Sequence, residues 1–82
     1  MTNPLNPYLY QIYRGEYTLD GQSYTGFGIS VVSTASNQIL ILIEDIALSQ
    51  KELCKLVRLC NELALDPIHI YDVVEDFLNA VH

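Results

Sequence analysis

Basic residues are scarce in this sequence. Lysine and arginine together number 4 against 10 acidic residues, which gives a formal net charge of −6. Because affinity for phosphates grows with the number of Lys and Arg that neutralise them, this shortage argues against a nucleic-acid-binding protein. It equally argues against attachment to an anionic membrane surface. The excess of acid suits a soluble protein, a basic partner, or an inhibitor that imitates nucleic acid.

Long apolar runs and paired cysteines are missing as well. No run approaches the roughly 18–20 apolar residues that cross a membrane, and the first residues lack a basic segment followed by an apolar one. The two cysteines, Cys54 and Cys60, fall about 240° apart on the helix predicted below, so they are badly placed for a disulfide. These features predict a cytoplasmic protein with reduced thiols.

The length of 82 residues favours a single domain with a small core. Half of the residues are hydrophobic, which indicates a folded chain. Residues 1–7 contain Asn-Pro twice, and a residue before proline is pushed away from helix. We therefore expect a flexible lead-in over residues 1–7 and one domain over residues 8–82.

The longest aliphatic run is Ile-Leu-Ile-Leu-Ile at residues 39–43, at the centre of a strand predicted over Gln38–Ile46. Successive side chains of a strand point to opposite faces, so this strand is apolar on both. We expect the three isoleucines of the run to face the protein's own helices. Leu40 and Leu42 then point outward and need another cover.

Two further strands are predicted before this run, over Tyr8–Leu19 and Ser23–Ser33. Asp20–Gly21 between them is typical of a type I′ hairpin turn, which needs positive φ at both central residues. Gly15 indicates a bulge or bend in the first strand. In the second strand Gly26 and Gly28 share a face and leave a shallow trough, which neighbouring tyrosines or a partner could fill.

Two helices follow. Ser49 with Glu52 three residues later forms a capping box at the start of the first, and Asp66–Pro67 supplies a cap and a first-turn proline for the second. The expected fold is therefore α+β: a three-stranded antiparallel β-meander followed by two α-helices packed on one sheet face, in the order βββαα.

The run Pro-Ile-His-Ile-Tyr-Asp-Val-Val-Glu-Asp-Phe-Leu at residues 67–78 resembles the C-terminal signature of a family of small uncharacterised bacterial proteins, the domain of unknown function DUF6514. Ile-Glu-Asp-Ile at residues 43–46 and Tyr24-Thr25 followed by Gly28-Ile29 are similar to earlier segments of that family. The resemblance implies kinship over residues 17–78. It implies no activity and no catalytic residue.

His69 is the main candidate for catalysis or metal binding, ahead of a carboxylate cluster of Glu44, Asp45 and Asp66 and of the thiol of Cys54. Asp66 and Asp72 flank it in the sequence, and Glu44 could join it in the fold. A histidine paired with a carboxylate can carry a proton or bind a metal, whereas a lone histidine more often caps a helix or packs at a helix junction. We expect a protein that is not an enzyme and has no cofactor and no small-molecule substrate.

The outer face of the sheet is the main candidate for a functional surface, because exposed apolar patches usually mark interfaces. We expect it to bind a second copy of the chain, forming a homodimer, or another protein. A cover formed by the helices or the N-terminal segment is the alternative. The residues predicted to form this interface are Tyr10, Ile12, Tyr24, Val32, Leu40 and Leu42.

An acidic stripe on the second helix supports a different function. Asp72, Glu75 and Asp76 lie on its outer side at helical spacing. Such a surface attracts a basic partner and accelerates encounter, although it also fits a merely solvated face. The alternative function is an acidic inhibitor or nucleic-acid mimic from a mobile element, which binds a basic groove on a nucleic-acid enzyme.

Overall fold

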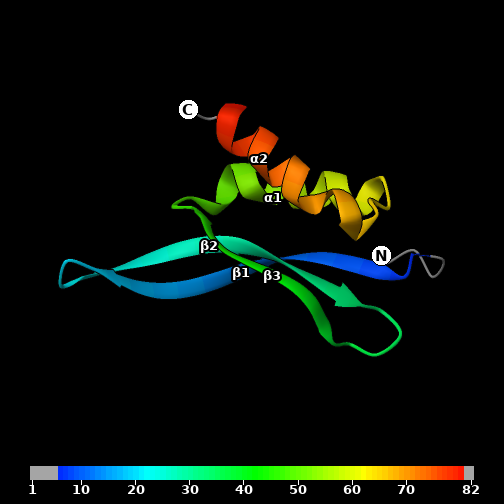
Figure 1. The fold of residues 1–82 in the computed structure, drawn as a ribbon, viewed down its shortest axis with the longest axis horizontal. Coiled ribbons are helices and arrows are strands. Elements are labelled where there is room, and N and C mark those ends of the chain that lie inside the picture. Colours follow the sequence, from blue (N-terminus) through cyan, green and yellow to red (C-terminus); the bar gives the residue numbers. More distant parts are fainter. Residues whose placement is uncertain (1–5, 81–82) are drawn as a thin grey trace.

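A computed structural model describes residues 6–80, and its elements follow the predicted order (Figure 1). Three antiparallel strands form one sheet in the order β1-β2-β3, and two helices follow. The α+β fold of order βββαα is confirmed. The elements are β1 (Tyr8–Leu19), β2 (Gln22–Ser33), β3 (Ile39–Ala47), α1 (Gln50–Glu62), the 3-10 helix η1 (Pro67–His69) and α2 (Ile70–Ala80).

The β1–β2 hairpin forms around the predicted turn. Asp20–Gly21 has positive φ at both residues, 52° and 78°, as a type I′ turn requires. The pairing then continues without a shift as far as Tyr8 opposite Ser33, so of the bulge or bend predicted at Gly15, the bulge is wrong. Glycine instead leaves room there for the phenol group of Tyr17, which a Cβ would overlap.

β3 carries the irregularities of the sheet, and the first lies near its start. Ile41 is opposite Val31 but Ile39 is opposite Val32, so Leu40 is an extra residue on β3. The bulge leaves the Ile39 side chain 59% exposed. The prediction that all three isoleucines of the run face the helices is therefore wrong for Ile39. The other two pack against the core as predicted.

The second irregularity lies near the end of β3. Three residues between Ile43 and Ala47 are opposite the single residue Gly28. The middle one, Asp45, has a φ of 54°, in the left-handed region. A Cβ on Gly28 would overlap the carbonyl oxygen of Ile43, so only glycine lets the two strands approach this closely.

Helix α1 begins at its predicted cap, whereas the second predicted cap, Asp66, starts the 3-10 helix η1, and α2 follows from Ile70. The side chains of Ser49 and Asp66 accept hydrogen bonds from the backbone N–H two residues on, at 3.4 Å and 3.1 Å. Glu52, expected to reach back to the cap amide, accepts a hydrogen bond from Lys55 Nζ at 3.3 Å instead. Each of these two helical segments therefore begins where a side chain next to it in the sequence accepts a hydrogen bond from a free backbone N–H.

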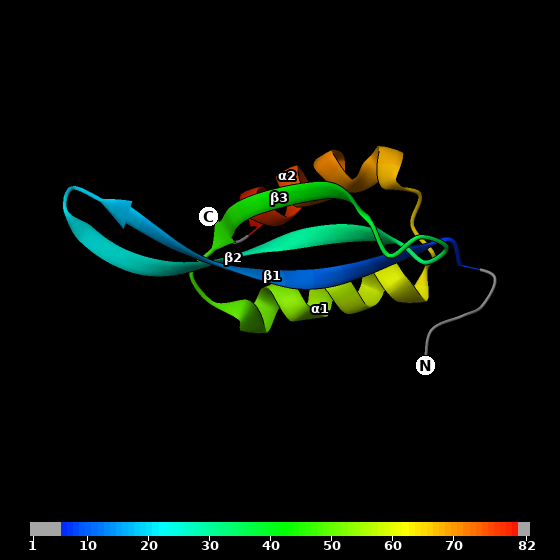
Figure 2. The ribbon, with the colours of Figure 1, turned by 90° about the horizontal axis from the view of Figure 1, so that it is seen from below.

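Both helices lie on the same side of the sheet (Figure 1), with α1 beside β1 and α2 on the side of β3 (Figure 2). No described helix lies on the other side, which we call the outer face. The core forms in the layer between sheet and helices, where apolar side chains leave water. It consists of Tyr10, Ile29, Val31, Leu53, Val57, Cys60, Ile70 and Val74.

The first described residues are attached to the end of the sheet. Thr34 donates from its backbone N–H to the carbonyl of Pro7 and from its hydroxyl to the carbonyl of Asn6, both at 3.0 Å. The Asn6 side chain is buried and accepts from the N–H of Tyr8 at 3.1 Å. Residues 1–5, the rest of the expected lead-in, and residues 81–82 lie outside the described residues.

Candidate functional site

Apolar side chains gather on the outer face along β3. Leu42 is 40% exposed, Leu40 50% and Ile39 59%. Val32 of β2 is opposite Ile39, and Leu9 of β1 is opposite Val32, so all three share this face. We call these five residues the apolar strip. A contiguous exposed patch of this kind is typical of a protein-binding surface.

Two of the six residues predicted for the interface lie on the other face. Tyr10 is 1% exposed, and Ile12 packs against the core. They are opposite Val31 and Ile29, which face the helices, and residues paired across two strands share a face. The prediction is therefore wrong for Tyr10 and Ile12. Leu9 takes their place on the outer face.

Tyr24, also predicted for the interface, lies on the outer face but away from the apolar strip, towards the hairpin turn. Its hydroxyl donates to Asp45 Oδ2 at 2.6 Å. Tyr17, directly opposite it on β1, donates to Glu44 Oε1 at 3.2 Å. The two rings are 5.6 Å apart between centroids. We call these four residues the tyrosine–carboxylate cluster.

The tyrosine–carboxylate cluster fills the trough predicted along the glycines. The ring of Tyr17 lies over Gly15, and its Cε2 is 3.1 Å from the position that a Cβ on Gly26 would take. The carboxylate of Asp45 occupies the remaining space above Gly26. Of the two occupants that the sequence left open, a neighbouring tyrosine takes the space over Gly26 together with the Asp45 carboxylate, and the backbone of β3 covers Gly28.

The phenols of this face are held in their protonated form. Loss of hydration, followed by the hydrogen bond to Glu44, raises the pKa of Tyr17 to about 12. The hydrogen bond to Asp45, followed by loss of hydration, raises the pKa of Tyr24. On the inner face, burial raises the pKa of Tyr10 to about 12. All three hydroxyls therefore stay protonated, and can donate hydrogen bonds, at pH values where a free tyrosine begins to ionise.

The free energy of unfolding is expected to fall as pH rises from about 10 to about 12. Tyrosine in an unfolded chain has a pKa of about 10, so in this window the unfolded chain binds fewer protons than the folded one, and stability declines. Tyr17→Phe removes one such phenol and makes the decline shallower. Urea unfolding over this pH range measures the free energy of unfolding of the wild type and of Tyr17→Phe. If it fell equally steeply with pH in both, the role given to Tyr17 would be contradicted.

One side chain of α1 occupies the edge of the sheet. Asn61 accepts from the backbone N–H of Tyr10 through Oδ1 and donates to the Tyr10 carbonyl through Nδ2, both at 2.8 Å. The hydroxyl of Tyr10 donates to the carbonyl of Leu65 at 2.6 Å. The amide of Asn61 thus makes the two bonds that a neighbouring strand would make. No spacing in the sequence indicates this role.

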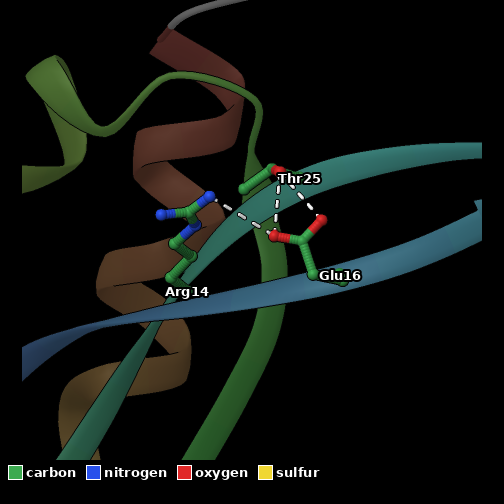
Figure 3. Close-up of polar contacts among 3 residues, drawn as sticks. All are labelled: Arg14, Glu16 and Thr25. Atoms are coloured by element: carbon green, nitrogen blue, oxygen red, sulfur yellow. Dashed lines mark hydrogen bonds and ion pairs between the residues drawn. The ribbon is translucent and has the colours of Figure 1, made fainter.

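Farther along β1, which is this edge strand, lie the charged side chains of Arg14 and Glu16 (Figure 3). The carboxylate of Glu16 lies 3.5 Å from Arg14 and accepts from the hydroxyl of Thr25, directly opposite, at 3.0 Å. Both charged side chains are about two-thirds exposed, so the ion pair adds little stability. Charged side chains on an edge strand do discourage pairing with another chain.

An open groove of about 430 Å³ lies between the end of β3, the start of α1 and α2. Apolar side chains form most of its lining, and carboxylates and a hydroxyl add polar groups. Through Asp45 it adjoins the tyrosine–carboxylate cluster. Its lining is Asp45, Ile46, Ala47, Leu48, Ser49, Glu52 and Phe77.

The other candidates lie apart from these surfaces. His69 is exposed at the end of η1. Within residues 6–80, no group of three or more His, Cys, Asp and Glu side chains could hold a metal ion. Both cysteines are free, and burial raises the pKa of the Cys60 thiol. His82 lies outside the described residues.

The acidic stripe is exposed as predicted. Asp72, Glu75 and Asp76 all lie on the solvent side of α2. Among the described residues the ion pairs are Arg14 with Glu16 and Lys55 with Glu52. No described basic side chain therefore neutralises the three carboxylates of α2.

None of the described helices has the length or apolar character needed to cross a membrane. Comparison with curated proteins and with solved structures finds no match. The model of a family of unknown function, DUF6514, matches residues 2–80, which is nearly the whole chain. The chain belongs to the DUF6514 family of unknown function.

Proposed function

We propose that the protein is a non-catalytic interaction module that associates with a second copy of itself through the apolar strip. The observation that carries this proposal is the exposure of Ile39, Leu40 and Leu42 on one strand, on a face that no described helix covers. The two cysteines stay reduced in the bacterial cytoplasm, which we take to be its compartment.

The apolar strip alone gives a modest affinity. Even full cover of the exposed half of three large aliphatic side chains on each of two copies would contribute at most roughly 6 kcal/mol, at about 1 kcal/mol each. Association costs at least about 4 kcal/mol in lost translational and rotational freedom. The side chains therefore bring a dimer only near the threshold of stability, and a stable one needs further contacts.

The wild-type protein is expected to be a dimer at micromolar concentration, and Leu42→Asp a monomer. The substitution places a carboxylate from each copy inside an apolar contact, where charges are costly to bury. Size-exclusion chromatography with light scattering measures the mass of both. A monomeric wild type would remove the proposal.

The matched control neutralises the acidic stripe through Asp72→Asn, Glu75→Gln and Asp76→Asn. These residues lie on the solvent side of α2, away from the apolar strip, so the dimer should persist. Loss of the dimer in this variant, with retention in Leu42→Asp, would assign self-association to α2 instead.

A second candidate function follows from the exposed and unneutralised acidic stripe. It suits an inhibitor or nucleic-acid mimic that docks in a basic groove of a nucleic-acid enzyme. Binding of this kind weakens with added salt and is lost in the neutralised variant, whereas contact through apolar side chains depends little on salt.

A further inference from the structure

We propose that the second copy adds to the sheet edge to edge: β3 pairs antiparallel with β3 of the other copy, so that two three-stranded sheets become one. This inference rests on the proposed self-association and specifies its geometry. It follows from a difference between the two edges of the sheet, from the direction of the β3 backbone groups, and from the order of residues along β3.

The edge at β1 is occupied. Asn61 binds both backbone groups of Tyr10, and Arg14 and Glu16 place charge farther along the strand. The other edge strand of the sheet is β3 (Figure 2). Along its run at residues 39–43, which contains no charged residue, no described side chain or further strand binds the outer backbone groups. An apolar, uncharged edge strand is a template for pairing with another strand.

The hydrogen bonds on β1 reveal which backbone groups of β3 face outward. Because Asn61 binds the N–H and C=O of Tyr10, those groups point away from β2. In an antiparallel pair, two residues opposite each other direct their N–H and C=O groups either towards each other or both away from each other. Because the groups of Tyr10 point away from β2, those of Val31, opposite it, point away from β1 and towards Ile41 of β3. The next residue, Leu42, therefore presents its N–H and C=O to the open edge.

The order of residues along β3 suits pairing with an identical strand. Leu-Ile-Leu at residues 40–42 reads the same in both directions, so an antiparallel pair centred on Ile41 places Ile41 opposite Ile41 and Leu42 opposite Leu40 of the second copy. The regular pairing ends there, because Leu40 is the bulged residue and Ile39 lies on the outer face. Leu42 then faces Leu40 of the second copy on the outer face. The apolar strips of both copies become continuous, and the outward backbone groups of Leu42 are satisfied.

The negative charge of Glu44 also favours antiparallel over parallel pairing of the two β3 strands. Antiparallel pairing centred on Ile41 directs Glu44 of the two copies towards opposite ends of the joined strands. The Glu44 carboxylates of the two copies are six residues apart, or about 20 Å, beyond the screening length of about 8 Å at physiological salt. Parallel pairing in register would place them side by side.

Amide hydrogen exchange in the wild-type protein tests this geometry. Exchange of the Leu42 N–H, followed by NMR at concentrations where light scattering finds monomer and where it finds dimer, is expected to slow by about tenfold or more in the dimer. Ile12 on β1 is the control, since by the same alternation its N–H points away from β2, and its exchange should not change with concentration.

The outcomes separate the inference from the proposed function. A dimer in which Leu42 exchanges as fast as in the monomer overturns edge pairing and leaves self-association intact. A dimer that protects Ile12 in place of Leu42 also overturns it, because β1 is then the joined edge. A protein that stays monomeric at every concentration removes both the proposed function and the inference.

Discussion

Gly28→Ala is expected to destabilise the protein by about 3 kcal/mol, because the added Cβ would overlap the carbonyl oxygen of Ile43. The Cα of Glu44 lies only 3.0 Å from the same position. Backbone cannot rotate aside as a side chain can, so β3 must move away from β2. A domain of this length has a total stability of about 4–12 kcal/mol, so urea unfolding should detect the loss easily.

Gly26→Ala is the matched control, two positions earlier on the same strand. There the added Cβ meets the carboxylate of Asp45, which lies at the end of a side chain that can rotate, and the ring of Tyr17 at 3.1 Å. The expected loss is about 1 kcal/mol. Equal losses for the two variants would show that the backbone contact at Gly28 is not the cause.

Asn61→Ala is expected to cost about 2–3 kcal/mol of stability. It removes both hydrogen bonds to the backbone of Tyr10, and a partly buried N–H and C=O are left without partners. The amide of Tyr10 should exchange faster with solvent. Because the variant also uncovers the β1 edge, it should aggregate at lower concentration than the wild type. Urea unfolding and amide exchange measure the first two effects, and light scattering the third.

Asn79→Ala makes the same substitution on the exposed surface of α2 and controls for helix propensity. Alanine is the better helix former, so this variant should be as stable as the wild type or slightly more stable. If Asn61→Ala were no less stable than Asn79→Ala, the contact with Tyr10 would contribute nothing.

Elements with local causes could be predicted from the sequence. The positive φ of the turn Asp20–Gly21 and the caps at Ser49 and Asp66 depend on residues next to each other, and the structure contains all three. The position of the turn also determines which side chains of β1 face the helices, which the prediction for Tyr10 and Ile12 did not take into account. A two-residue turn after Leu19 fixes the pairing of Tyr10 with Val31, which places Tyr10 inside.

The remaining features depend on contacts between distant residues. No turn residue marks Asp45, which adopts a positive φ because β3 bulges over Gly28. The exposure of Ile39 follows from the bulge at Leu40, which the regular alternation of the run conceals. Helical spacing places Asn61 on α1 without indicating that its amide binds β1. The exposure predicted for Leu42 is correct because it depends only on alternation with Ile41 and Ile43 in the regular part of β3, and Leu40 is exposed as predicted although it lies at the bulge.

The contact between Asn61 and Tyr10 also constrains how the chain acquires its fold during synthesis. The β1–β2 hairpin closes through residues near in sequence, whereas Asn61 is 51 residues from Tyr10. On a growing chain the hairpin can form while the helix that covers its first strand is still inside the ribosome. Until α1 emerges and docks, that strand is open to pairing with other nascent chains, so the time between these two events limits the yield of soluble protein.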